Sequence, residues 1–400
     1  MNIAFINAVP YGSTGKIVSQ IADCAEKNGD NVLICVSWAK RHHKYRRKNV
    51  FEGSFLEKAI HILLGRITGC TGCFSVFDTC RIIFKLKKFK PDVIHLHLLH
   101  SDSFNLPVLF KYIKRQNIPV VWTMHDCWAL TGYCPHFVVA NCDKWQTGCF
   151  QCSQLKKYTF IDSTKFMWKL KKNCFTGVSD LSIVAPSEWL KETIKKSYLG
   201  NYKTTVINNG VDLSVFNFKP NSFREEYGIG QDQFIVLGVS FDWSYKKGID
   251  VFADLAELLD NEKFKIVLVG IDKTMEKTLP KNIISIARTE NQEELAKIYS
   301  AADLFINPTR EEVFGLVNVE ALGCETPVVT FNTGGSPECI DESCGIVLKK
   351  NDSEHMKAAI EYIQKERPFK AEACRKRAEL FSGDKVYARY YELLKSKGKG

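Results

Sequence analysis

The sequence predicts an α/β protein built from two doubly wound domains, and three observations support this. The chain has 400 residues, enough for two cores. Short apolar strands alternate with amphipathic helices, the pattern of parallel sheets with helices on both faces. The surplus of basic over acidic residues belongs entirely to the first half of the chain. A composition that is 45% hydrophobic and 25% charged excludes disordered, collagen-like and coiled-coil proteins.

The first predicted domain covers residues 1–185 and begins with a strand, a glycine-rich turn and a helix. The turn contains Gly12 and Gly15, and the helix has an apolar face formed by Ile17, Ile21 and Cys24. Apolar runs of strand length recur along the rest of this half. The expected strands are 3–6, 32–36, 93–97, 120–122 and 183–185.

The second predicted domain covers residues 186–383, and a helix at about 384–400 is expected to pack back on the first. Two sheets of this type are expected to face each other across a cleft, because parallel sheets bind ligands beyond the carboxyl ends of their strands. The expected strands are 234–239, 266–269, 304–306 and 327–330, and the expected helices are 249–259, 293–302, 316–323 and 385–394.

The net charge of +10 becomes informative when the chain is divided at residue 185. The first part has 25 basic and 12 acidic residues, a net of +13, and the remainder has 30 and 33, a net of −3. A basic first domain suggests an anionic partner: nucleic acid, a phospholipid surface or a phosphorylated substrate. A solvated lysine face is the alternative.

The N-terminal segment and the cysteine content bear on location. The segment lacks the basic and apolar regions of a signal peptide, and no uncharged apolar run reaches 18 residues. We therefore expect a cytoplasmic chain that does not span the membrane. In a reducing compartment, its fifteen cysteines would be thiols or metal ligands.

Two features of the first half follow predicted strands. The turn Gly12-Ser-Thr-Gly15-Lys16 could bring backbone amides to a phosphate, or could simply be a tight turn, since it matches neither a P-loop nor GxGxxG. His125, after strand 120–122, could bond a sugar or phosphate or exchange a proton, or could be structural. For His95 and His97, packing and hydrogen bonding are favoured over metal binding.

Four cysteines follow His125 in an irregular segment. A C-x7-C-x6-C-x2-C spacing suits a structural zinc ion that would order a loop without a core, and free thiols or a redox disulfide are the alternatives. The candidate ligands are Cys134, Cys142, Cys149 and Cys152.

Two motifs of the second half follow predicted strands and are charged. Lys246 and Lys247 could neutralise a diphosphate leaving group, or could be a surface pair. In the segment 312–321, a helix is expected to start near Gly315, where first-turn amides could approach a phosphate. Glu312 lies before that helix and could hold hexose hydroxyls, whereas Glu320 lies further along it and could accept hydrogen bonds from ribose.

With these motifs in order, the sequence resembles family 4 retaining glycosyltransferases, which have the GT-B fold and use nucleotide-sugar donors. Glu312 and Glu320 fit the family's E-x7-E signature, and a Gly-Gly-Ser-Pro-Glu loop follows at 334–338. Residues 207–212 resemble the family's Asn-Gly-Val-Asp turn. The first half is similar to a bacterial subgroup that makes exopolysaccharide, capsule or lipopolysaccharide, with polyprenyl-diphosphate-linked acceptors at the inner membrane.

The resemblance implies roles for individual residues. Lys247, assisted by Lys246, would contact the donor diphosphate, with Gly15 nearby in the first domain. Glu320 would bind ribose, and Glu312 the transferred sugar. His125 would lie near the reacting sugar. The amides expected to meet the diphosphate belong to Gly315, Leu316 and Val317.

One position departs from the family pattern. The family usually has an arginine five residues before the lysine of the Lys-Gly pair, and this chain has Asp242 there. Either Lys246 or another cation compensates, or the donor is held differently. A pseudoenzyme is one reading of this departure.

The expected function is transfer of a hexosyl unit from a nucleoside-diphosphate sugar to a lipid-linked or other saccharide acceptor, with retention of configuration. No Asp-x-Asp metal motif is present, so no cofactor is expected for catalysis. The basic segments 40–48 and 81–90 are expected to meet an anionic membrane at the cytoplasmic face. The alternatives are a sugar-nucleotide epimerase, a glycogen-synthase-like enzyme, or a nucleic-acid-binding protein, although the basic segments lack interleaved aromatics.

Overall fold

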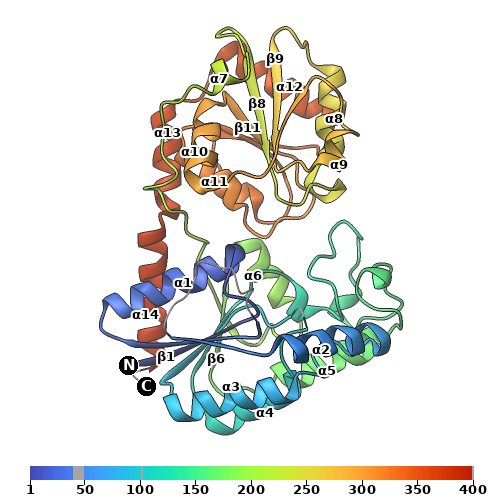
Figure 1. Cartoon of the computed structure of the whole chain (residues 1–400), viewed down its shortest axis with the longest axis vertical. Helices are drawn as coiled ribbons and strands as arrows, with labels where there is room; N and C mark the ends of the chain where they lie inside the picture. The colour runs from blue at the N-terminus through green and yellow to red at the C-terminus, as the bar shows by residue number, and fades with distance from the viewer. Residues whose placement is uncertain (39–48, 101, 399–400) are drawn as a thin grey trace. The chain divides into compact units, whose positions relative to one another are not determined.

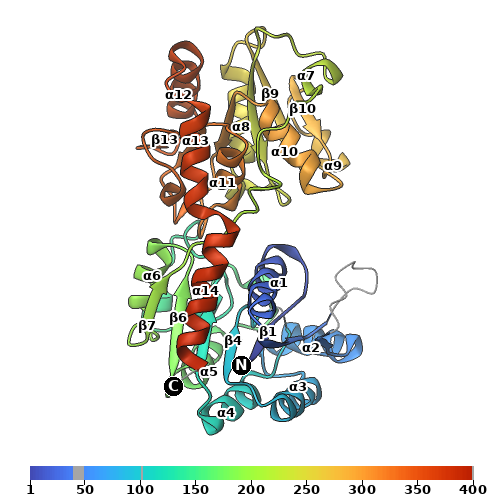
Figure 2. The same cartoon turned by 90° about the vertical axis from the view of Figure 1, so that its left-hand side faces the viewer.

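The computed structural model describes residues 1–38, 49–100 and 102–398, so the predicted basic segment 40–48 lies outside the described residues. The chain divides into two compact units (Figures 1 and 2). The first comprises Met1–Asn208 and Val386–Gly400, and the second comprises Asn209–Lys385. The described helices include none that is both long and apolar enough to cross a membrane.

The first unit contains a parallel sheet with the strand order β3-β2-β1-β4-β5-β6-β7. Ile3 pairs with Val32 on one side and with Val93 on the other, so β1 lies where the strand order reverses. Loops that leave the carboxyl ends of neighbouring strands at such a point converge. The strands are β1 Asn2–Asn7, β2 Asn31–Val36, β3 Val50–Glu52, β4 Val93–Leu96, β5 Val120–Thr123, β6 Leu181–Ala185 and β7 Lys203–Val206.

Helices cover both faces of this sheet. Residues of α1 and α14, among them Ile21 and Tyr390, pack with Phe5 and Val121 into one core, so α14 completes the first unit. Figure 2 shows α14 running along this sheet, with both chain termini at the same end of the unit. The helices are α1 Gly12–Lys27, α2 Phe55–Thr68, α3 Val76–Phe89, α4 Leu106–Gln116, α5 Thr164–Phe175, α6 Glu188–Lys195 and α14 Gly383–Gly398.

The second unit contains a parallel sheet with the order β10-β9-β8-β11-β12-β13. Its two faces bury separate cores, one including Phe305 and Val319 and the other Phe252 and Ile360. The strands are β8 Phe234–Val239, β9 Phe264–Val269, β10 Ile283–Ile286, β11 Leu304–Asn307, β12 Val328–Phe331 and β13 Gly345–Leu348. The helices are α7 Phe223–Glu226, α8 Ile249–Leu258, α9 Lys273–Glu276, α10 Gln292–Ala301, α11 Leu316–Gly323, α12 Ser353–Glu366 and α13 Ala371–Ala378.

The two parallel sheets with flanking helices confirm the predicted α/β fold class. The division between the units falls later than residue 185, because β7 pairs with β6 and extends the first sheet. Four strands escaped the sequence prediction, namely β3, β7, β10 and β13, and each lies at the edge of its sheet.

Candidate functional site

The lysine pair Lys246–Lys247 lies in a short 3₁₀ turn (Tyr245–Lys247) that follows β8. Gly248 ends this turn with φ +75°, and a Cβ there would overlap the carbonyl oxygen of Pro308. The amide of Arg310 donates to the carbonyl of Lys246 at 2.8 Å. The turn after β8 is therefore fixed against the turn after β11, where the strand order of the second sheet reverses.

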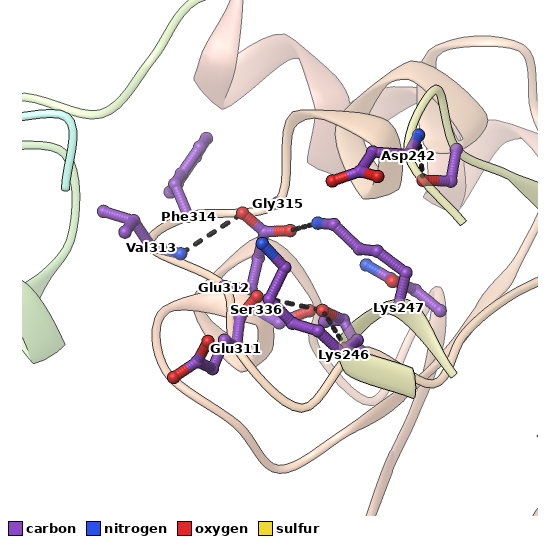
Figure 3. Close-up of polar contacts among 12 residues, drawn as sticks. Asp242, Lys246, Lys247, Glu311, Glu312, Val313, Phe314, Gly315 and Ser336 are labelled. Atoms are coloured by element: carbon purple, nitrogen blue, oxygen red, sulfur yellow. Dashed lines mark hydrogen bonds and ion pairs between the residues drawn. The ribbon is translucent and has the colours of Figure 1, made fainter. Parts of the chain in front are cut away.

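Lys247 and Glu312 form the central ion pair of the second unit. The lysine Nζ lies 2.8 Å from Oε2 of Glu312, and both side chains are half-buried. Oε1 of the same carboxylate accepts a hydrogen bond of 3.2 Å from the amide of Val313. Figure 3 shows the carboxylate between these two donors, while that of Glu311 points away. The structure thus brings together two residues for which the sequence predicted separate roles.

The glycine loop after β12 holds the main chain of Glu312. Gly334 has φ +58°, and a Cβ there would overlap the carbonyl oxygen of Glu312. The amide of Gly335 donates to that same oxygen at 3.0 Å. Only a residue without a side chain permits this approach. The loop therefore sets the position from which the Glu312 carboxylate extends.

Helix α11 begins where the sequence predicted. Gly315 has φ +96° and precedes the first helical residues, Leu316 and Val317. Amides in the first turn of a helix carry partial positive charge and suit an anion. Glu320 lies further along α11, where its Oε2 is 3.4 Å from the hydroxyl of Tyr299. The Lys247–Glu312 ion pair, the start of α11 and Glu320 all lie in the second unit.

A buried polar network underneath α11 was missed by the sequence analysis. Asn318 accepts from Nδ2 of Asn307 at 2.8 Å and donates to Oγ of Ser336 at 2.9 Å. Ser336 in turn lies 2.7 Å from the hydroxyl of Thr330. The network joins the ends of β11 and β12 to the helix. Polar residues at the carboxyl ends of two neighbouring strands were the available signal.

Asp242 is exposed in the loop after β8, and its amide donates to Oγ of Ser240 at 3.2 Å (Figure 3). Arg310 is a cation beside this loop that the sequence analysis did not single out. It makes two hydrogen bonds to Asp250, of 2.8 and 2.7 Å, and its guanidinium lies 3.9 Å from the ring centre of Tyr245. Arg310 therefore braces the lysine turn and already has an anionic partner.

His125 follows β5 in the first unit, as the sequence predicted. Its Nε2 lies 3.0 Å from Nδ1 of His97, and the two rings stack. Burial lowers the pKa of His125 to about 4, since the charged imidazolium is costly to desolvate. The imidazole is therefore neutral near pH 7. His95 bonds Thr123 at 2.8 Å, which is the hydrogen-bonding role expected for it.

Gly15 lies within the first turns of α1, after β1. A Cβ at this position would overlap the main chain of Pro10, so glycine is required by the close approach of these two segments. This packing accounts for the glycine, and a phosphate contact is not needed to explain it. Gly15 comes after β1 and His125 comes after β5. Both strands are interior strands of the parallel first sheet, so the loops that follow them leave the sheet at the carboxyl ends of its strands.

The four clustered cysteines do not form the predicted zinc site. They line one cavity, but the described residues contain no group of three or more His, Cys, Asp or Glu side chains that could hold a metal ion. All are free thiols. The free-thiol alternative agrees with this arrangement.

The fold and the order of these motifs define a two-domain glycosyltransferase of the GT-B type. Residues 14–215, about half of the chain, match the model of Glycosyltransferase Family 4, and residues 221–381 match that of Glycosyl transferases group 1. The chain belongs to glycosyltransferase family 4.

One relative is the putative colanic acid biosynthesis glycosyl transferase WcaC of Escherichia coli K12, 23% identical over 271 residues, which are 66% of this chain and 65% of the relative. For two further curated relatives, the matched segment spans 51% and 47% of their length.

Solved structures support the fold along the whole chain. Sucrose-phosphate synthase from Thermosynechococcus elongatus has a TM-score of 0.72 and 18% identity, with 99% of this chain and 98% of that chain covered. HepE from Anabaena, solved in complex with UDP, has a TM-score of 0.71 and 16% identity, with 99% and 100% covered.

Proposed function

We propose that this protein is a retaining hexosyltransferase that moves a sugar from a nucleoside-diphosphate donor to a lipid-linked or other saccharide acceptor in bacterial surface polysaccharide synthesis. The observation that carries the proposal is the Lys247–Glu312 pair, 2.8 Å apart, at the carboxyl ends of two strands and just before the first turn of α11. A cation, a carboxylate and a helix N-terminus are the groups that a sugar diphosphate needs.

The donor is proposed to bind the second unit. Lys247, with Lys246, would neutralise the diphosphate together with the amides of Gly315, Leu316 and Val317. Glu312 would hold hydroxyls of the hexose, and Glu320 those of the ribose. HepE has been solved with UDP-glucose, which supports a nucleotide sugar as the class of donor. Because the lysine already has a carboxylate partner, it is oriented before the donor arrives.

The reaction is proposed to proceed through an oxocarbenium-like transition state. The bond from the anomeric carbon to the diphosphate oxygen breaks while the acceptor oxygen bonds that carbon on the same face, and the acceptor proton leaves with the diphosphate. Negative charge grows on the departing group, so Lys247 and the start of α11 stabilise the transition state electrostatically. Neutral His125 would hydrogen-bond the reacting sugar. With these groups, no divalent ion is needed.

The acceptor is proposed to bind the basic first unit, and a polyprenyl-diphosphate saccharide fits its charge. WcaC is named for colanic acid biosynthesis, which supports a role in surface polysaccharide synthesis. An acceptor of this kind would require peripheral contact with the inner face of the plasma membrane. The positive first half of the sequence favours such contact.

The test is a transfer assay with a panel of nucleotide sugars and saccharide acceptors, with each donor first screened for thermal stabilisation of the protein. Glu312→Ala should reduce transfer by at least about a hundredfold, as expected for loss of a charged contact to the sugar. Glu342→Ala, which removes an exposed carboxylate of the same unit, should leave the rate unchanged.

Three results would contradict the proposal. Full activity of Glu312→Ala would remove the assigned site. Turnover without any acceptor would favour an epimerase. Loss of transfer on EDTA treatment, restored by magnesium, would contradict catalysis by lysine and helix amides alone.

A further inference from the structure

Helix α2 is attached to the first unit by its polar side. His61 is fully buried, with Nδ1 2.7 Å from Oγ of Ser75 and Nε2 accepting from the amide of Gly72 at 3.0 Å. Gly65, one turn later, is buried on the same side, where a Cβ would lie 3.1 Å from Oδ1 of Asp102. An ordinary surface helix buries its apolar side. Here the buried residues of α2 are His61, which is held by hydrogen bonds, and Gly65, and neither is a large apolar side chain.

The apolar side of α2 faces outward. Leu56, Ile60, Leu63 and Ile67 follow each other at intervals of four, three and four residues, so they form one stripe along the helix. All four are exposed, with Leu56 at 67% and Leu63 at 59%. A contiguous exposed apolar stripe of this kind marks an interaction surface.

Further exposed apolar residues extend the stripe at both ends. Near the start of α2, the carboxylate of Glu57 accepts from the amide of Phe77, whose side chain is 70% exposed. Near its end, the carbonyl of Arg66 accepts at 2.9 Å from the amide of Phe160, which is 73% exposed. We define the α2 surface as Leu56, Ile60, Leu63, Ile67, Phe77 and Phe160.

The helices around this surface are strongly basic. Apart from Lys171 of α5, which is fully buried, α2, α3 and α5 contain nine Lys and Arg residues and two acidic residues, a net of +7. Both acids are engaged by the protein, Glu57 with the amides of Phe77 and Asp78, and Asp78 with Arg81 at 3.0 Å. α5 starts beside the end of α2, where Ser163 donates to the carbonyl of Thr68 at 2.9 Å. The apolar stripe therefore belongs to a group of helices with a net positive charge.

We propose that the α2 surface docks onto a bilayer containing anionic lipids and inserts its apolar side chains at the boundary between headgroups and acyl chains. The stripe is buried in the apolar boundary, and the surrounding lysines and arginines meet the anionic headgroups. The proposal adds insertion to the electrostatic contact suggested above. It does not depend on the transferase activity, because lipid binding is measured without donor or acceptor.

The charge of the α2 surface and its surrounding helices favours a lipid bilayer over a second copy of the chain or nucleic acid. In a symmetric pair of chains, the same surface would meet itself and bring two groups of positive net charge together. Nucleic acid would satisfy the lysines but would leave the aliphatic stripe in water. A bilayer with anionic headgroups satisfies both parts of the surface.

The test measures binding of the full chain to vesicles of phosphatidylcholine alone or with about 30% phosphatidylglycerol. Leu56→Ser combined with Leu63→Ser should weaken binding to the anionic vesicles about tenfold or more, because two inserted side chains are lost. Leu380→Ser is the matched control: this leucine is 59% exposed in the second unit, and binding should be unchanged.

The depth to which α2 inserts into the bilayer is measured with the variant Leu63→Trp. Vesicles with brominated acyl chains should quench its fluorescence more than that of the unmodified protein. Equal vesicle binding by the Leu56/Leu63 variant and the unmodified protein would overturn the proposal. So would a dimer of the unmodified protein in light scattering that the double variant abolishes, since the occupant would then be a second copy.

A failure of membrane insertion can be distinguished from a failure of the proposed transferase function. The double variant should keep its thermal stability and its rate with a water-soluble acceptor analogue, because the α2 surface belongs to the first unit and the proposed donor-binding residues belong to the second. Unfolding of the double variant is checked by circular dichroism. Quenching of Leu63→Trp then stands as the independent readout.

Discussion

Gly334 shows how one residue without a side chain supports the Glu312–Lys247 pair. Its φ of +58° lies in the left-handed region, and the Cβ of any other residue would overlap the carbonyl oxygen of Glu312. Two costs therefore coincide at this position, one from backbone conformation and one from crowding. A side chain at this position would therefore displace the main chain of Glu312, whose carboxylate is proposed to bind the sugar.

We expect Gly334→Ala to lower the free energy of unfolding by about 3 kcal/mol and to reduce sugar transfer, because Glu312 must move. Gly228→Ala is a matched control, since Gly228 has φ +63° but nothing within 4 Å of a Cβ. It should cost only about 1 kcal/mol and spare activity. Urea unfolding and the transfer assay check both. Equal effects of the two substitutions would remove the role assigned to the contact with Glu312.

At the residue level, sequence reasoning found candidates but not their geometry. Lys247 and Glu312 were singled out because each follows a strand, yet they are 65 positions apart and their pairing depends on the fold. Gly15 was considered for a phosphate contact, and its packing on Pro10 could be seen only in three dimensions. The zinc prediction failed because spacing alone does not report whether thiols converge on one point.

At the level of elements, the sequence predicted the interior strands and missed the edges. Interior strands of a parallel sheet are buried on both faces and appear as continuous apolar runs. The edge strands β3, β7, β10 and β13 are partly exposed, and β3 and β7 contain charged or polar residues in place of a continuous apolar run. β10 and β13 do contain short apolar runs, but runs this short do not by themselves distinguish a strand from a segment of helix.

Helix α11 is fixed to its sheet by polar contacts, which gives a prediction for Asn318. Asn318→Ala should lower the free energy of unfolding by about 1–3 kcal/mol, because the buried amide of Asn307 loses its acceptor. Asn332→Ala removes an exposed amide of the same unit and should change stability by less than about 0.5 kcal/mol. Chemical denaturation measures both. A cost at Asn318 no larger than at Asn332 would show that the network does not hold the helix.

At the level of the whole molecule, buried histidines couple stability to pH. Burial lowers the pKa of His61 and of His125 to about 4 and that of His95 to about 3, all below the usual value of about 6.5. The folded protein therefore binds fewer protons than the unfolded chain in this range. The stabilisation is complete above about pH 6.5 and is lost progressively as the pH falls toward 4.

We expect the urea midpoint to fall steeply between about pH 6.5 and about pH 4. Each of the three histidines contributes up to about 1.4 kcal/mol per pH unit in that range. His95→Gln should reduce the slope, because it removes a buried imidazole whose pKa is lowered in the folded chain. A slope that stays the same in His95→Gln would show that this histidine titrates alike in the folded and unfolded chain.

Because α14 belongs to the first unit, that unit is formed by two segments that are separated in the sequence. The α14 residues Tyr387 and Tyr390 belong to the core under β1, but the whole second unit, Asn209–Lys385, separates them from the rest of that core. During synthesis on the ribosome, β1 to β7 therefore emerge long before the helix that covers them. The second unit has all of its own strands by then and can fold first, so the domain translated first is completed last.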